Sequence, residues 1–290
     1  MPTNGFINLY KTSGITSNKA LSILKSILKE NNIAEKVGHM GTLDPIAEGV
    51  LPVALGRATR LFEYSLDKVK RYTAAFRFGI STDTLDSDGT ILSEGGKVPK
   101  EEEIKSILPC LIGEIDQIPP AYSAKVVDGV RAYRLARQGV EVKLEAKRVT
   151  IYSIDFIGKV NEDTYKFDIS CSGGTYIRSI ARDMGEMLKT CAVMTSLIRT
   201  KSGYFDINEC ITIEDLRKDL VTHIIPMEKV ISDIPAYYVN EKFKKPLLNG
   251  VPLAIKNLPD GIFRVYLEEK LVGIGSKDDT EGLRINTWLL

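Results

Sequence analysis

Residues 38–49 read GHMGTLDPIAEG and join a helical pattern to an apolar run that ends at Leu55. The stretch sets one histidine and two carboxylates among glycines. Pro45 biases the residue before it toward an extended backbone, so the Asp44 carboxylate can project from a loop. An aspartate in this position also suits an Asx-turn that caps the next segment. The Asp44/Glu48 pair also permits a two-carboxylate glycosidase. That mechanism requires a particular distance between the two carboxylates, which the sequence does not fix.

Regular patterns flank this loop on both sides. Residues 6–10 are apolar, and Thr16 or Ser17 can cap a helix that ends near residues 31–32 and has one apolar face. Alternating apolar residues over 71–79 and 164–171 predict half-buried strands. A second helix with an apolar face follows Gly173 and Gly174. These elements predict a mixed α/β fold.

The pattern of residues changes after Pro235. Short β-like runs at 251–255, 261–267 and 270–274 are separated by Pro-Asp-Gly and Gly-x-Gly sequences that are typical of turns. We therefore expect one larger domain over residues 1–235 and a small, mostly β domain over residues 236–290.

Composition narrows the function classes. Hydrophobic residues make up 43% and charged residues 27% of the 290-residue chain, and the net charge is +1, as in an ordinary globular enzyme. No apolar run approaches the roughly 20 residues of a membrane span, and no signal-peptide pattern precedes residue 10, so we expect a cytoplasmic protein. The four cysteines are scattered and only two histidines occur, which predicts free thiols and no metal site. Nucleotide-binding glycine motifs are missing, so no nucleotide cofactor is indicated.

Two further segments carry weaker signals. Residues 83–89 resemble a calcium loop, but Thr84 and Gly95 occupy the positions where acidic ligands are required, and a polar turn after a strand is the better interpretation. Residues 125–148 hold seven Lys and Arg residues against three acidic ones, with Tyr122 and Tyr133 nearby. Such a run can follow a phosphate backbone, although a solvated helix face gives the same pattern.

Taken together, these segments resemble the TruB family of pseudouridine synthases. The residues that carry the resemblance occur in the family's order: Gly38 to Pro45 with Ala47, Gly49 to Pro52, Lys70-Arg71-Tyr72, Thr82 to Gly89, Pro120 with Tyr122-Ser123-Ala124, Tyr133, Ala136-Arg137, Gly139, and Gly174 to Ser179. One departure is visible, because Thr12 follows Lys11 where the family usually has proline. That change puts the rigidity of the active-site support in doubt, but not the chemistry.

The resemblance implies a mixed α/β catalytic domain over residues 1–235, built on a central, largely antiparallel sheet. It also implies a small PUA-like RNA-binding domain over residues 236–290. It implies isomerisation of a T-loop uridine of tRNA by base flipping, with Asp44 as the nucleophile and with no cofactor. Arg178 would pair with Asp44 and Tyr72 would stack on the flipped uracil. Tyr176 and Leu197 would line the pocket, and His39 would assist extrusion of the base.

The resemblance also sets the expected partner and the alternatives. The segment 119–147 would act as a thumb that closes over the T-stem-loop of tRNA, and the enzyme would act as a monomer. A guide-RNA-dependent synthase and a non-catalytic tRNA chaperone of the same fold remain as alternatives. The sequence does not decide whether Asp44 attacks uracil C6 or ribose C1′.

Overall fold

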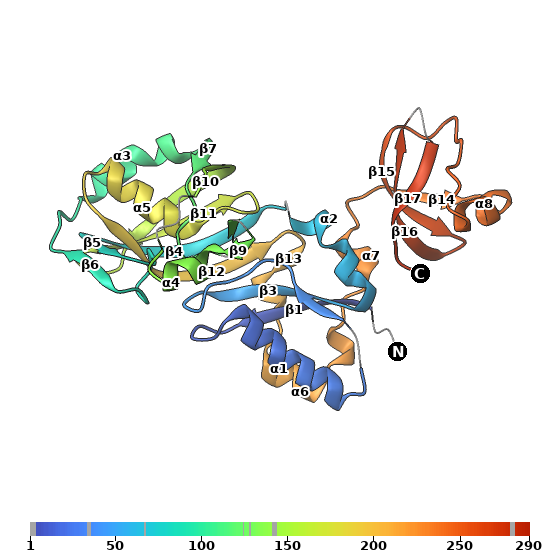
Figure 1. Cartoon of the computed structure of the whole chain (residues 1–290), viewed down its shortest axis with the longest axis horizontal. Coiled ribbons are helices and arrows are strands. Elements are labelled where there is room, and N and C mark those ends of the chain that lie inside the picture. The colour runs from blue at the N-terminus through green and yellow to red at the C-terminus, as the bar shows by residue number, and fades with distance from the viewer. Residues whose placement is uncertain are drawn as a thin grey trace.

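The computed structural model describes residues 4–33, 36–66, 68–123, 125–127, 129–140, 144–278 and 282–290. Nine strands within these residues form one sheet in the order β1-β3-β12-β4-β11-β10-β7, with β2 beside β3 and β13 beside β12 (Figure 1). Every neighbouring pair in this sheet is antiparallel except β3 and β12. The expected mixed α/β fold with a largely antiparallel central sheet is therefore confirmed. The strands of this sheet are β1 (Gly5–Lys11), β2 (Val37–His39), β3 (Glu48–Leu55), β4 (Lys70–Phe78), β7 (Gly113–Gln117), β10 (Lys147–Lys159), β11 (Thr164–Cys171), β12 (Ala192–Ser202) and β13 (Phe205–Asp206).

The centre of the sheet forms where alternating apolar residues face the core. On β4, Ala74 and Phe76 are fully buried, and they lie opposite Phe167 and Tyr165 of β11. Phe76 and Phe167 stack with their ring centroids 5.0 Å apart. Cross-strand aromatic pairs of this kind fix the register of a sheet.

The described residues form eight α-helices, and two of them, α3 and α5, cover one face of the central strands (Figure 1). α5 buries Ile180, Ala181 and Met184 on one face, which agrees with the apolar periodicity of this segment. At the other end of the sheet, α1 begins at the Thr16 cap, whose hydroxyl accepts the Lys19 amide. The helices are α1 (Ser17–Glu30), α2 (Glu63–Leu66), α3 (Glu101–Leu111), α4 (Ala132–Arg137), α5 (Ile177–Met187), α6 (Ile213–Lys218), α7 (Met227–Val230) and α8 (Lys244–Leu248). Among the described residues, every helix is too short or too polar to cross a bilayer.

Two short hairpins project from this part of the chain. The first pairs β5 (Ile80–Thr82) with β6 (Ile91–Glu94), and the second pairs β8 (Val126–Val127) with β9 (Val130–Arg131). The second hairpin leads directly into α4.

A second, four-stranded sheet begins at Ala236 and has its own apolar cluster around Val265 and Val272 (Figure 1). Its strands are β14 (Ala236–Val239), β15 (Gly261–Leu267), β16 (Lys270–Asp278) and β17 (Gly282–Trp288). This sheet also packs on the first part of the chain. Leu271 belongs to the same buried cluster as Phe6 and Leu61, and Arg60 donates to the Trp288 carbonyl at 2.7 Å.

Two expectations for this small sheet are wrong. Residues 251–255 form no strand, because Pro252 has no amide hydrogen for a ladder, and only an isolated bridge joins Leu253 to Leu283. The Gly273-Ile274-Gly275 sequence is not a turn but lies inside β16. A Cβ at Gly273 would come within 2.4 Å of the Thr287 carbonyl oxygen on β17, so close backbone approach explains the glycine.

Candidate active site

The Asp44 loop connects β2 to β3 and is held from two sides. The Ser17 hydroxyl donates to the Leu43 carbonyl at 2.9 Å and accepts the Leu43 amide at 2.8 Å. The ammonium group of Lys11, which is 1% exposed, donates to the carbonyls of Thr12, Ile15 and Pro45. The start of α1 and the end of β1 therefore fix the backbone on both sides of Asp44.

The predicted ion pair between Asp44 and Arg178 is present. Nε and Nη2 of Arg178 lie 2.9 and 3.0 Å from the two carboxylate oxygens of Asp44, which is a bidentate arrangement. The Arg178 side chain is 6% exposed and that of Asp44 30% exposed. The carboxylate thus binds the guanidinium and keeps one side open, and it does not form the Asx-turn that the sequence left as an alternative.

Backbone carbonyls hold the guanidinium of Arg178 in place. Nη1 donates to the Thr84 carbonyl at 2.8 Å, and Nη2 donates to the Tyr122 carbonyl at 3.1 Å. Arg178 stands at the start of α5, where Gln117 exchanges two hydrogen bonds with the backbone of Tyr176. The planar guanidinium is therefore fixed before any substrate arrives.

Asp86 is a member of this cluster that sequence reasoning missed. The polar turn expected over residues 83–89 is present, but Asp86 points inward, is 5% exposed and lies 3.5 Å from Nη1 of Arg178. Burial raises the pKa of the Asp86 carboxyl, while the Thr84 hydroxyl and Arg178 oppose this shift. The only signal in the sequence was the Thr84-x-Asp86 spacing, in which the hydroxyl donates to the carboxylate at 2.5 Å.

Tyr72 and Leu197 share a face of the sheet next to the ion pair. In the antiparallel β4/β12 pair, Leu197 lies opposite Ala74 and Arg199 lies opposite Tyr72, so all four side chains point to the same side. Tyr72 is 8% and Leu197 6% exposed. Burial raises the pKa of the Tyr72 hydroxyl, and the nearby Arg199 guanidinium acts against that shift.

Tyr176 lies at the beginning of α5 and is half-buried. Burial raises the pKa of its hydroxyl, and the positive charge of Arg178 counteracts this effect. Ser123 is 4% exposed, and its hydroxyl makes no hydrogen bond with any described group. The structure therefore places Tyr176 beside the ion pair, on the side of the expected thumb.

His39 lies close to Arg199. Burial and the positive charge of Arg199 lower the pKa of its imidazole, and its buried Nδ1 has no partner among the described residues. Arg199, a second residue that the sequence did not single out, is 1% exposed and donates to the carbonyls of Gly41 and Val50 at 3.0 and 2.7 Å. A Cβ at Gly49, where φ is +98°, would lie 2.4 Å from the Arg199 carbonyl oxygen, so only glycine fits there.

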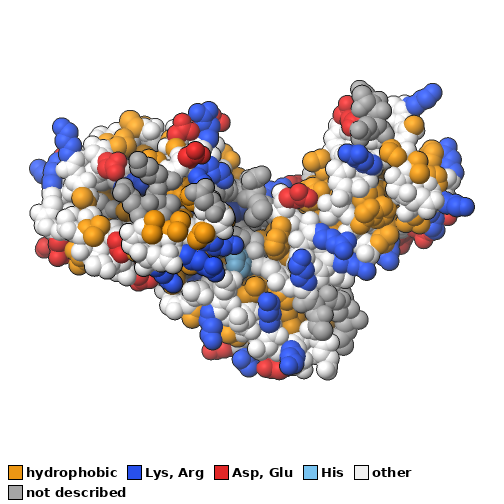
Figure 2. Space-filling view, in the orientation of Figure 1, with side chains coloured by type: hydrophobic (Ala, Val, Ile, Leu, Met, Phe, Trp, Pro, Cys, Tyr) orange, Lys and Arg blue, Asp and Glu red, His pale blue; other side chains and the backbone are white. Residues whose placement is uncertain are grey.

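The expected thumb is described in part, because Ala124, Asp128 and residues 141–143 lie outside the described residues. Within it, the Tyr122 hydroxyl donates to Asp83 at 3.2 Å, and Arg137 lies 5.7 Å from the centre of the Tyr133 ring. Arg131, Arg134 and Arg137 are exposed. Figure 2 shows Lys and Arg side chains gathered near a histidine in the middle of one face of the molecule.

The cluster provides an oriented carboxylate, a buried cation and an apolar and aromatic lining. It can support nucleophilic attack by Asp44 on a group that stacks against Tyr72. In the part of the chain that the structure describes, no three or more His, Cys, Asp and Glu side chains gather as a metal site. Glu48, the second carboxylate of the glycosidase alternative, lies near the Tyr10 hydroxyl and raises its pKa together with burial.

Two family models match consecutive parts of the chain. Residues 25–177 match the N-terminal domain of TruB family pseudouridylate synthase, and residues 178–232 match the C-terminal domain of tRNA pseudouridylate synthase B. Proteins named tRNA pseudouridine synthase B are similar over almost the whole chain. The protein from Clostridium perfringens strain ATCC 13124 is 41% identical and that from Clostridium tetani 42%, covering 99% and 97% of this chain and 99% and 98% of their own lengths.

Solved structures of larger assemblies contain similar chains. A chain of an H/ACA ribonucleoprotein bound to a substrate RNA containing 2′-deoxyuridine matches with a TM-score of 0.73 and 25% identity, covering 99% of this chain and 85% of that chain. A chain of a Cbf5-Nop10-Gar1 complex matches with a TM-score of 0.72 and 27% identity, covering 98% of this chain and 84% of that chain.

Proposed function

The chain belongs to the TruB family of pseudouridine synthases and isomerises uridine to pseudouridine in tRNA, and we propose that it does so in the T-loop with Asp44 as the nucleophile. The observation that carries the assignment of Asp44 is its bidentate pair with the buried Arg178. The bidentate pair holds the carboxylate of Asp44 in one orientation, as a nucleophile requires.

The reaction moves the uracil from one attachment to another. The bond between C1′ and N1 breaks, a bond between C1′ and C5 forms, the C5 proton leaves and N1 gains a proton. The base must first leave the loop stack, which costs a few kcal/mol and is repaid by contacts in the pocket. Isomerisation requires no oxidant, reductant or group donor.

The residues around the ion pair support the remaining roles. We assign the stacking of the uracil to Tyr72, because it shares a sheet face with Leu197 next to the pair. Leu197 and Tyr176 would line the pocket around the base. His39, which lies close to Arg199, would assist extrusion of the base.

RNA recognition is assigned to two peripheral segments. The exposed Arg131, Arg134 and Arg137 would contact phosphates when the thumb closes over the T-stem-loop. The four-stranded sheet over residues 236–290 would act as a PUA-like RNA-binding domain within a catalytic monomer. The free cysteines are compatible with the cytoplasm, where tRNA is modified.

One observation favours the alternative of a guide-RNA-dependent synthase. The similar solved chains come from H/ACA and Cbf5 assemblies. Those chains are 25% and 27% identical, whereas the relatives named tRNA pseudouridine synthase B are 41% and 42% identical over nearly their whole length. A stand-alone enzyme is therefore the better proposal.

Incubation of the purified protein alone with an unmodified tRNA transcript tests both the T-loop reaction and its independence from a guide RNA. We expect pseudouridine at one T-loop uridine, mapped by reverse-transcription stops after carbodiimide treatment. A transcript with cytidine at that position is the matched control and should remain unmodified. Modification that appears only after a guide RNA is added would support the alternative.

A further inference from the structure

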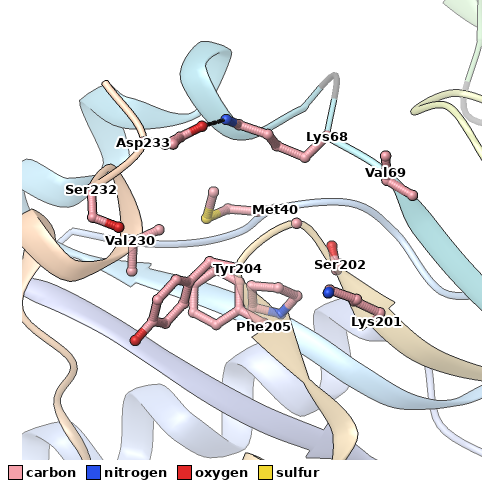
Figure 3. A pocket seen from close by; sticks show the side chains of 12 residues that line it. Met40, Lys68, Val69, Lys201, Ser202, Tyr204, Phe205, Val230, Ser232 and Asp233 are labelled. Carbon is pink, nitrogen blue, oxygen red and sulfur yellow. Dashed lines mark hydrogen bonds and ion pairs between the residues drawn. The ribbon is translucent and has the colours of Figure 1, made fainter. Parts of the chain in front are cut away.

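A second pocket lies outside the residues assigned above. It has a volume of about 350 Å³, in the range of small-ligand pockets, and lies between Met40, the β12–β13 turn and the segment after α7 (Figure 3). Its floor is apolar, because Met40, Phe205 and Val230 are buried and belong to one cluster. Such a floor suits a flat, apolar group.

The pocket adjoins the active site along the same two strands. Tyr72 lies opposite Arg199, and two residues further along the β4/β12 pair Lys70 lies opposite Ser202, which lines the pocket. Two residues of strand span about 7 Å. The backbone at the edge of the pocket therefore lies about 7 Å along the sheet from the backbone at Tyr72.

An exposed aromatic ring stands at the pocket. Tyr204 is 41% exposed and meets Phe205 edge-on, with ring centroids 5.5 Å apart and an interplanar angle of 86°. The preceding Gly203 has φ +59°, and a Cβ there would lie 2.9 Å from Cβ of Lys68, so the tight turn requires glycine. The turn thus holds in place a tyrosine that is suited to stack on a base.

The charges at the two ends of the pocket differ. At one end, Lys68 forms an ion pair with Asp233, while Lys201 lies at the other end (Figure 3). Lys201 is exposed and forms no ion pair with any described residue. A positive charge without a partner beside an exposed ring suits a phosphate that is attached to a stacked base.

We propose that this pocket holds a second unpaired nucleotide of the tRNA, with its base against Tyr204 and its phosphate at Lys201. The proposal rests on the tRNA substrate assigned above, and the nucleotide is not the uridine that is isomerised. An apolar side chain of a peptide could also pack on the apolar floor of the pocket. The combination of the exposed Tyr204 ring with a lysine that forms no ion pair with any described residue favours a nucleotide.

The test uses the full-length protein and an unmodified tRNA transcript. Tyr204→Ala and Lys201→Gln should each raise the Kd for tRNA about tenfold, whereas Tyr204→Phe, which keeps the ring, should restore binding to within about twofold of wild type. Lys201→Gln should also make the dependence of log K on log salt shallower by about 0.7–0.9, the share of one phosphate. Lys25→Gln, an exposed lysine of α1 without an ion pair to any described residue, is the matched control and should bind as wild type does.

Crosslinking then locates the nucleotide. With p-benzoylphenylalanine in place of Tyr204, we expect a crosslink to one unpaired nucleotide other than the isomerised uridine. Wild-type affinity of Tyr204→Ala, or crosslinks confined to a paired stem, would overturn the proposal. The wild-type protein is assayed for pseudouridine on the same transcript, so that a failure of the proposed reaction is seen separately from a failure of the pocket.

Discussion

The active centre and the junction with the C-terminal sheet are each bridged by an ion pair between distant parts of the chain, and the two pairs differ in their exposure. Arg178, at 6% exposure, meets Asp44 through two hydrogen bonds. Lys68 and Asp233 at the junction are 38% and 57% exposed. A charge pair shielded from water interacts far more strongly than one in contact with it.

The junction combines apolar contact with hydrogen bonds such as that from Arg60 to the Trp288 carbonyl, and its ion pair is exposed. Leu271 of the C-terminal sheet is buried in one cluster with Phe6 and Leu61, whereas the centre around Arg178 relies on directed polar contacts. We therefore expect substitutions at the centre to affect the reaction and substitutions at the junction to affect stability.

The largest effect is expected for Asp44→Asn. Removal of the proposed nucleophile should reduce turnover by on the order of 10⁴-fold or more. The Kd for tRNA should change by less than about tenfold, or roughly 1.4 kcal/mol, because the carboxylate contributes to chemistry more than to binding. Release of tritium from C5-labelled uridine in tRNA measures the first quantity, and filter binding the second. Substantial turnover by the variant would contradict the assignment of the nucleophile.

The second-largest effect is expected for Arg178→Lys. Lysine keeps the charge but cannot make the bidentate pair or reach both the Thr84 and Tyr122 carbonyls in the same geometry. We expect the single-turnover rate to fall about 100-fold, or roughly 2.7 kcal/mol. A variant that reacts at the wild-type rate would remove Arg178 from the active site.

Leu271→Ala tests the junction. Deleting a buried leucine side chain leaves a cavity and should lower the free energy of unfolding by about 2–3 kcal/mol. Thermal melting should show a clear fall in Tm, and the single-turnover rate at saturating tRNA should stay close to wild type at temperatures where the variant is folded. A loss of rate in the folded variant would show that the junction takes part in forming the active centre.

Asp86→Asn should have a smaller effect on the centre. Arg178 would keep Asp44 and both carbonyl partners, so we expect the single-turnover rate to fall by less than about tenfold, or roughly 1.4 kcal/mol. A fall as large as that of Arg178→Lys would give Asp86 a role equal to that of Asp44 in orienting the guanidinium.

Lys68→Ala should have the smallest effect. An exposed ion pair contributes about 0–1 kcal/mol, so Tm should fall by less than about 3 °C. Raising the salt concentration should reduce the difference between the two proteins further. A fall in Tm as large as that of Leu271→Ala would mean that the exposed pair, and not apolar contact, holds the junction.

Much of the fold could be predicted because its signals are local. The helix capped by Thr16, the strand over 164–171 and the helix of Arg178 each follow from periodicity and capping within a few residues. The errors arose where partners are distant. The run at 251–255 had a strand-like composition but contains a proline, and it forms only one isolated bridge. Position 273 must be glycine because the backbone of β17, which lies further along the chain, approaches it closely.

The sequence pointed to Asp44 and Arg178 through its resemblance to the TruB family, since each stands in a motif whose residues are contiguous, and the structure shows that the two form an ion pair. Only the tertiary structure decided which other groups meet them. Asp86 was assigned to a polar turn and Arg199 was not singled out. Both are buried, with Asp86 next to Arg178 and Arg199 against the loop that carries Asp44. Burial and the direction of a side chain depend on elements far apart in the chain, so a local pattern cannot specify them.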